Sequence, residues 1–99
     1  MTQLGVVGGG TMGAGIAEVA ARAGDQVLIL ERDQETADAA RARIAASLAR
    51  GVKRGKLSEE DADAALARLT TTTTVDDFSD RELVIEALPE IENLKVSFF

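Results

Sequence analysis

The chain has 99 residues, 45% of them hydrophobic and 28% charged, with a formal net charge of −6. This length suits one small domain, and the composition argues against disorder, a membrane span and a secretory leader, so we expect a cytoplasmic protein. The absence of cysteine excludes disulfides and cysteine-based zinc sites, and the absence of histidine removes the commonest general base near neutral pH.

The first thirty residues predict a strand, a helix and a second strand. Residues 2–8 predict a short buried strand that runs into glycine, and residues 11–24 carry a helical spacing of apolar residues with Gly24 as a stop. Residues 26–31 are almost continuously apolar, which is typical of a strand covered on both faces. The order predicts a β-α-β unit with parallel strands. The apolar face expected for the helix comprises Ile16, Val19, Ala20 and Ala23.

Two helices are predicted next. Asp33 can cap the first, which ends near Gly51 and Gly55. The segment Ser58-Glu59-Glu60-Asp61 resembles a capping box and starts the second helix. The apolar stripe of the first helix is Ala37, Ala40, Ile44, Leu48 and Val52, and that of the second is Ala62, Ala65, Leu66 and Leu69.

The last third of the chain completes the predicted sheet. The β-branched run from Thr70 to Val75 favours a strand near a sheet edge, with a low-complexity linker as the alternative. Residues 76–79 suggest a short helical turn and residues 83–88 a further apolar strand. After Pro89, residues 91–99 are expected to begin another helix. The fold class is therefore α/β with a parallel sheet.

The charges are unevenly distributed along the chain. Residues 41–56 carry six Lys or Arg side chains and no acid, although the chain as a whole is acidic. An acidic protein with one local basic face is a poor nucleic-acid binder, but that face could attract a small phosphorylated ligand.

The glycines between the first strand and the first helix predict a dinucleotide-binding site. Gly8, Gly10 and Gly13 form a G-x-G-x-x-G motif. The first glycine permits a tight turn, the second lets the backbone approach a pyrophosphate, and the third lets the helix pack closely on the strand. The helix N-terminus also offers N–H groups to phosphates. The bare motif is weak because glycines occur in ordinary turns, but its strand-helix-strand context supports binding.

Glu31 ends the second predicted strand, 18 residues after Gly13. A carboxylate at this place can accept hydrogen bonds from the ribose hydroxyls of a dinucleotide, and the alternative is a solvated acid at a strand end. Glu31 would repel a 2′-phosphate, which favours NAD over NADP. The neighbouring Arg32 works against this preference because an arginine here can hold that phosphate.

The segments GVVGGGTMGAGIAEVAARAG and GKLSEEDADAALARLTTTTTVDDFSDRELVIEALPE are similar to the NAD-binding domain of 3-hydroxyacyl-CoA dehydrogenases, including bacterial 3-hydroxybutyryl-CoA dehydrogenases. The resemblance spans residues 1–99. It implies the first half of a Rossmann-type fold, with strand order 3-2-1-4 and a helical pair inserted between strands 2 and 3. It also implies an oxidoreductase of fatty acid metabolism (β-oxidation) that transfers hydride between the 3-hydroxyl of a 3-hydroxyacyl-CoA and NAD.

Residue roles follow from the same resemblance. Ser47 and Arg54, two helical turns apart, match the family's contacts with the CoA end, and the alternative is a solvated helix end. Glu90 and Lys95 match residues near the cofactor, and the alternative is a helix-start acid and a surface lysine. No catalytic or metal-binding residue is implied within this chain. The implied cofactor-binding residues are Gly8, Gly9, Gly10, Thr11, Met12, Gly13, Glu31, Ala87, Glu90 and Lys95.

In the family pattern, the catalytic histidine, its partner glutamate and the helical C-terminal domain lie beyond residue 99. We therefore expect an incomplete NAD-binding domain that is inactive alone and self-associates through an exposed edge or face at the fourth and first strands. The expected partner is an acyl-CoA, without nucleic acid or membrane, and the full-length form would be a homodimer. Two alternatives stay open: a stand-alone dinucleotide-binding module, and a hydroxyisobutyrate- or phosphogluconate-type dehydrogenase, against which Glu31 and the helical insertion argue.

Overall fold

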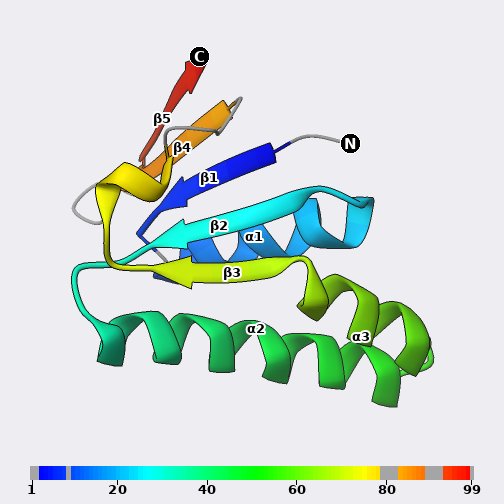
Figure 1. The fold of residues 1–99 in the computed structure, drawn as a ribbon. Coiled ribbons are helices and arrows are strands. Elements are labelled where there is room, and N and C mark those ends of the chain that lie inside the picture. The colour runs from blue at the N-terminus through cyan, green and yellow to red at the C-terminus, as the bar shows by residue number, and fades with distance from the viewer. Residues whose placement is uncertain (1–2, 9, 79–82, 89–92, 99) are drawn as a thin grey trace.

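The computed structural model describes residues 3–8, 10–78, 83–88 and 93–98 of the chain. Within these residues, one sheet has the strand order β3-β2-β1-β4-β5 (Figure 1). Its strands are β1 (Gln3–Val7), β2 (Gln26–Leu30), β3 (Leu69–Thr72), β4 (Leu83–Leu88) and β5 (Asn93–Phe98). The helices are α1 (Thr11–Ala23), α2 (Gln34–Lys53), α3 (Glu59–Ala67) and the 3-10 helix η1 (Val75–Phe78).

The first four strands run parallel in the predicted order 3-2-1-4. Central β1 pairs with β2 on one side and β4 on the other, and Val6 lies opposite both Ile29 and Ile85. The threonine-rich β3 pairs with β2, where Thr71 lies opposite Ile29, and forms one edge of the sheet as expected. Parallel neighbours need crossover connections, which α1 and the α2–α3 pair supply between β1, β2 and β3.

The hydrophobic core lies between one face of the sheet and the three α-helices. Alternate strand residues share a face, and those of this face pack against residues from α1, α2 and α3. All three helices therefore cover the same side of the sheet, and α2 and α3 lie side by side (Figure 1). The strand residues of this core are Leu4, Val6, Val27, Ile29 and Leu69.

The predicted apolar face of α1 is wrong in part. Ile16 and Ala20 do pack against the core, but Val19 is 68% exposed and Ala23 is exposed. The fully buried positions are the alanines, Ala14, Ala17 and Ala21. Small side chains are needed on this face because α1 lies very close to β1, and an apolar spacing alone cannot separate an alanine stripe from a neighbouring valine.

The inserted helical pair begins as predicted. The Asp33 side chain accepts a hydrogen bond from the Thr36 N–H at 2.8 Å, and Ser58 Oγ accepts one from the Asp61 N–H at 3.0 Å. Four of the five stripe residues of α2 are buried, whereas Leu69 begins β3 instead of extending α3. No described helix is long and apolar enough to cross a membrane.

The expectation of a helix over residues 91–99 is wrong. Asn93–Phe98 form β5, which pairs antiparallel with β4. Apolar residues stand at alternate positions, Leu94, Val96 and Phe98, which is the period of a strand. An antiparallel edge strand on a parallel sheet is common. As a consequence, β4 is an inner strand and not the sheet edge that the sequence suggested.

Candidate dinucleotide-binding site

The first glycine of the motif forms the turn that leaves β1. Gly8 has φ +86°, a left-handed conformation that glycine adopts at low cost. Its N–H donates a hydrogen bond to the Leu30 carbonyl at 2.9 Å, which ties the end of β1 to the end of β2. Gly9 lies outside the described residues.

The other two glycines meet different surroundings. A Cβ at Gly13 would lie 1.8 Å from the Gly8 carbonyl oxygen, so only glycine allows α1 to pack this closely on the turn. A Cβ at Gly10 would meet no protein atom within 4 Å. The backbone around Gly10 therefore borders open space, which fits the approach of a pyrophosphate.

The N-terminus of α1 opens beside these glycines. Gly10 is the N-cap, and its carbonyl accepts the first helical hydrogen bond from the Ala14 N–H at 2.8 Å. Glycine provides no side-chain cap, and the first turn contains no acidic residue. The first-turn N–H groups of Thr11, half-buried Met12 and Gly13 thus form a positive helix end that a phosphate could occupy.

Glu31 directly follows β2 and is only 8% exposed. Its backbone N–H donates to the Thr72 carbonyl at 2.9 Å, which holds the ends of β2 and β3 together. The residue lines a cavity of about 390 Å³, the glycine cavity, at the carboxyl ends of β1 and β2. The structure therefore brings Gly8 and Glu31, which are far apart in the sequence, to one cavity. The lining residues are Val7, Gly8, Leu30, Glu31, Arg32, Thr36 and Thr73.

Two hydroxyl-bearing residues of this cavity were not predicted from the sequence. Thr36 lies in the first turn of α2 and is half-buried, and Thr73 follows β3 and is exposed. A signal for Thr73 was available, because carboxyl ends of parallel strands meet at one edge of the sheet. The run of identical threonines concealed which of them faces this edge.

Arg32 borders the cavity, but a neighbouring carboxylate holds it. The Arg32 Nε lies 3.4 Å from Asp33 Oδ2 in an exposed pair. Asp33 Oδ1 accepts the hydrogen bond of the Thr36 N–H. The hydrogen bonds to Thr36, followed by the charge of Arg32, lower the pKa of Asp33 below its ordinary value of 3.8.

Other predicted site residues lie away from this cavity or are described only in part. At 1.5 Å per helical residue, Ser47 and Arg54 lie about 20 Å and about 30 Å along α2 from Gln34. Ser47 is half-buried and Arg54 is the exposed C-cap of α2. Ala87 lies near the carboxyl end of β4, and Lys95 lies opposite Glu86 on β5 and not on a helix. Glu90 lies outside the described residues.

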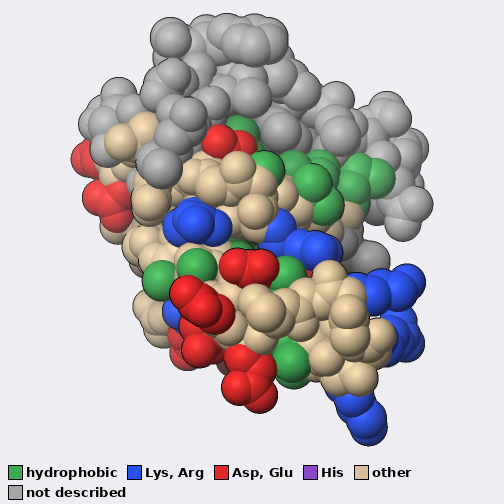
Figure 2. Space-filling model, turned by 90° about the vertical axis from the view of Figure 1, so that its right-hand side faces the viewer, with side chains coloured by type: hydrophobic (Ala, Val, Ile, Leu, Met, Phe, Trp, Pro, Cys, Tyr) green, Lys and Arg blue, Asp and Glu red, His purple; other side chains and the backbone are tan. Residues whose placement is uncertain are grey.

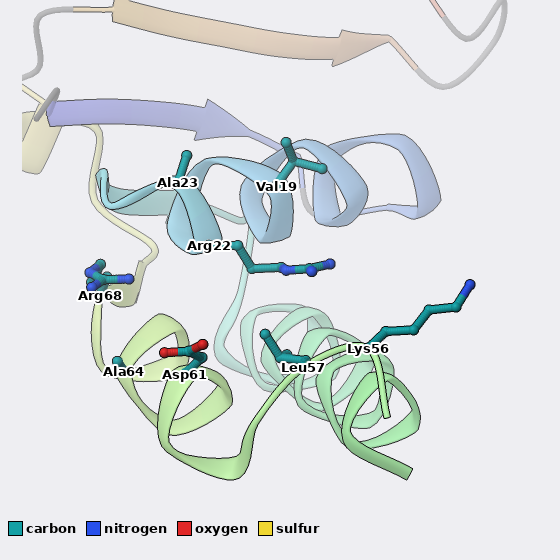
Figure 3. A pocket seen from close by; sticks show the side chains of 8 residues that line it. All are labelled: Val19, Arg22, Ala23, Lys56, Leu57, Asp61, Ala64 and Arg68. Carbon is teal, nitrogen blue, oxygen red and sulfur yellow. The ribbon is translucent and has the colours of Figure 1, made fainter. Parts of the chain in front are cut away.

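A second cavity, of about 580 Å³, lies between α1 and the α2–α3 turn (Figure 3). Figure 2 looks onto this end of the molecule and shows Lys and Arg side chains gathered at one lower edge. Three cations and one acid line the cavity, and Arg68 is already bonded through its guanidinium to the Ala21 carbonyl at 2.8 Å. The lining residues are Val19, Arg22, Ala23, Lys56, Leu57, Asp61, Ala64 and Arg68.

Comparisons with known proteins also indicate a dinucleotide-binding domain, as the glycine turn does. The family described as "3-hydroxyacyl-CoA dehydrogenase, NAD binding domain" matches residues 3–99. A 3-hydroxybutyryl-CoA dehydrogenase of Mycobacterium tuberculosis H37Rv is 50% identical over 97 residues, which cover 98% of this chain and 34% of that protein. A 3-hydroxyadipyl-CoA dehydrogenase of Escherichia coli K12 is 44% identical over 94 residues, which cover 95% and 20%.

The solved structures agree with the sequence comparison. The crystal structure of M. tuberculosis FadB2 superimposes with a TM-score of 0.88 at 51% identity, over 91% of this chain and 32% of that one. The chain thus spans about a third of the length of the relatives it matches in M. tuberculosis. Together with the glycine turn between β1 and α1, these matches show that the chain belongs to the 3-hydroxyacyl-CoA dehydrogenase family and corresponds to its NAD-binding domain.

Proposed function

We propose that this chain is the NAD-binding part of an enzyme that transfers hydride between the 3-hydroxyl of a 3-hydroxyacyl-CoA and NAD. The observation that carries the proposal is that Gly8, which precedes the N-terminus of α1, and Glu31 line one cavity at the carboxyl ends of β1 and β2. Ligands of open parallel sheets bind at this edge. Membership of the family and the names of the 3-hydroxybutyryl-CoA and 3-hydroxyadipyl-CoA relatives support the substrate class.

Each group at the glycine cavity has a distinct binding task. The backbone from Gly8 to Gly13 and the N–H groups of α1 receive the pyrophosphate. The Glu31 carboxylate accepts hydrogen bonds from the ribose hydroxyls, and Val7 and Leu30 supply apolar contact for the adenine side. The residues present therefore fit NAD. When bound, NAD supplies the hydride acceptor, and these residues bind and orient it.

Proton transfer is not assigned to any residue of this chain. Oxidation of a 3-hydroxyl needs a group that removes the hydroxyl proton as the hydride leaves, and the sequence contains no histidine. In this proposal the base comes from outside residues 1–99. The chain alone is expected to bind NAD and to show no dehydrogenase activity.

The carboxyl end of α2 is the proposed contact for the CoA end of the substrate. Ser47 and Arg54 share one face of α2. Lys56 follows closely and lines the cavity of Figure 3 together with Arg22 and Arg68. Cations concentrated at one end of an acidic protein favour a phosphorylated ligand there.

Calorimetric titration of the chain with NAD and NADP tests the cofactor assignment. We expect NAD to bind more tightly, and Glu31→Gln to weaken NAD binding by about tenfold or more because a charged hydrogen-bond acceptor is lost. Glu35→Gln is the matched control, since Glu35 is exposed in the first turn of α2 and does not line the cavity. Tighter binding of NADP, or equal losses in both variants, would contradict the assignment.

Titration with CoA separates the dehydrogenase proposal from a module that only binds NAD. We expect CoA to bind, and Arg54→Gln to weaken it by about tenfold through the loss of a charged contact. Lys53→Gln is the control because Lys53 is an exposed cation of the same helix end that lies next to Arg54 in the sequence and therefore points away from the face shared by Ser47 and Arg54. NAD binding without any CoA binding would favour the module.

A further inference from the structure

We propose that Asp33 is a positioning residue for cofactor choice: its carboxylate holds the Arg32 guanidinium and keeps it from serving a 2′-phosphate at the glycine cavity. The inference rests on the proposed function, because it concerns the same cavity. It adds a role to a residue that otherwise only caps α2.

Arg32 is placed where it would weaken the preference for NAD. It directly follows Glu31, lines the same cavity and is exposed, with a side chain that is 83% accessible. A guanidinium is always charged and binds phosphate oxygens in a forked geometry. Without a competing partner, Arg32 would offset the repulsion between Glu31 and a 2′-phosphate.

Asp33 supplies that competing partner from a fixed position. Its Oδ1 accepts the Thr36 N–H at 2.8 Å, so the carboxylate is anchored to the first turn of α2 whatever Arg32 does. Its Oδ2 lies 3.4 Å from Arg32 Nε. One carboxylate oxygen therefore caps α2, and the other contacts the arginine. Within the described residues, Asp33 is the acid that forms an ion pair with Arg32.

The charges around the cavity also favour a ligand without a 2′-phosphate. Glu31 and Asp33 flank Arg32, so the three residues together are negative. Neutralising Asp33 would leave one acid and one cation, and the cation would be the mobile member, because Glu31 is buried and Arg32 is exposed. A long exposed side chain can turn toward a new anion at little cost.

The test measures binding of 5′-AMP and adenosine 2′,5′-bisphosphate, which differ only in the 2′-phosphate. Asp33→Asn keeps a good N-cap and removes the charge. We expect the affinity ratio to shift toward the bisphosphate by about two- to fivefold, the range of an exposed ion pair. The shift should vanish in the Arg32→Gln background and shrink at high salt, which a merely structural change would not reproduce.

Asp38→Asn is the matched control for net charge. Asp38 is exposed on the same helix, accepts a hydrogen bond from Gln34 and does not line the cavity. If wild-type protein binds neither nucleotide, the proposed function fails and this inference with it. Three results with a wild-type protein that binds 5′-AMP would overturn only the role of Asp33. In the first, Asp33→Asn leaves the affinity ratio of the two nucleotides unchanged. In the others, Asp38→Asn shifts that ratio equally, or Asp33→Asn still shifts it in the Arg32→Gln background.

Discussion

At the scale of single residues, Gly10 and Gly13 show how one motif combines two requirements. The Cβ missing at Gly13 would collide with the Gly8 carbonyl, and the hydrogen bond from Gly8 to Leu30 holds that carbonyl in place. The Cβ missing at Gly10 would meet open space. Gly13 is therefore required for packing α1 on β1, whereas Gly10 is required only if a ligand comes close to the backbone.

This contrast predicts that a substitution at Gly13 lowers stability, whereas one at Gly10 lowers NAD affinity. Gly13→Ala should lower the free energy of unfolding by about 3 kcal/mol, the upper range for an overpacked site. Gly10→Val should change it by about 1 kcal/mol or less, as expected for an N-cap, and should weaken NAD binding by about tenfold or more. Urea denaturation and calorimetric titration of both variants check this. Unchanged NAD affinity in Gly10→Val would refute the dinucleotide assignment.

Asp33 predicts a pH dependence confined to acid conditions. The pKa of Asp33 is lowered in the folded chain, chiefly by the hydrogen bonds to Thr36. The cap therefore contributes its stability above the unfolded value of 3.8 and loses it as the pH falls through the lower folded pKa. The difference in melting temperature between wild type and Asp33→Asn should begin to shrink as the pH falls below the unfolded value of 3.8 and should vanish below the folded pKa. A constant difference down to low pH would show that the charge of Asp33 contributes nothing.

At the scale of elements, two arginines fix where β3 begins. Arg41 on α2 donates to the Leu69 carbonyl at 2.9 Å and to the Leu66 carbonyl at 3.4 Å. Arg68 donates to the Ala21 carbonyl in the last turn of α1. Arg68 thus bonds a carbonyl at the carboxyl end of α1, and Arg41 bonds one at the carboxyl end of α3 and one in β3; a cation is favoured at a helix carboxyl end. The other end of β3 is tied to β2, because the Thr72 carbonyl accepts the Glu31 N–H.

Removing the Arg41 contacts should loosen this edge of the sheet. Arg41→Met retains most of the apolar stem and loses two charged hydrogen bonds, so we expect the free energy of unfolding to fall by about 1.5–3 kcal/mol. Arg50→Met, at an exposed position of α2, should cost less than about 1 kcal/mol. Equal losses in the two variants, measured by urea denaturation, would assign the effect to general charge and not to the β3 contacts.

At the scale of the whole molecule, the sheet ends in two edges of different character. β3 forms one edge with four residues, and β5 forms the other with six. Outer strands carry backbone N–H and C=O groups without a ladder partner on one side, and such groups can pair with another chain. Within the described part of the chain, the three α-helices pack on one face of the sheet, and β3 and β5 each pair with a single neighbouring strand.

We therefore expect the 99-residue chain to self-associate as its concentration rises. The edge involved is that of β5 or β3 and not that of β4, which β5 covers. Light scattering and sedimentation over a concentration series provide the measurement. A monodisperse monomer at the highest concentration would contradict the expectation.

Local signals in the sequence were enough to predict most of the elements and to place Gly8 and Glu31 at the ends of β1 and β2. The G-x-G-x-x-G spacing, the Asp33 and Ser58 caps and the apolar runs each depend on residues within one or two turns of each other. The position of Glu31 after β2 followed from the same reasoning. These features were predictable because backbone conformation and helix capping are decided by near neighbours in the chain.

Long-range packing determined the features that the sequence did not predict. Periodicity did not reveal that alanines and not Val19 form the buried face of α1, because that depends on how closely the Gly8–Gly13 contact draws the helix to the sheet. Pairing with β4 places residues 93–98 in a strand. Thr36 and Thr73 meet at one cavity only after the parallel strands align their ends. By itself the sequence determined the glycine turn, the helix caps and the first strand-helix-strand unit, because these depend on near neighbours in the chain. The pairing of strands, burial, edges and cavity walls depend on contacts between distant segments, which only the tertiary structure contains.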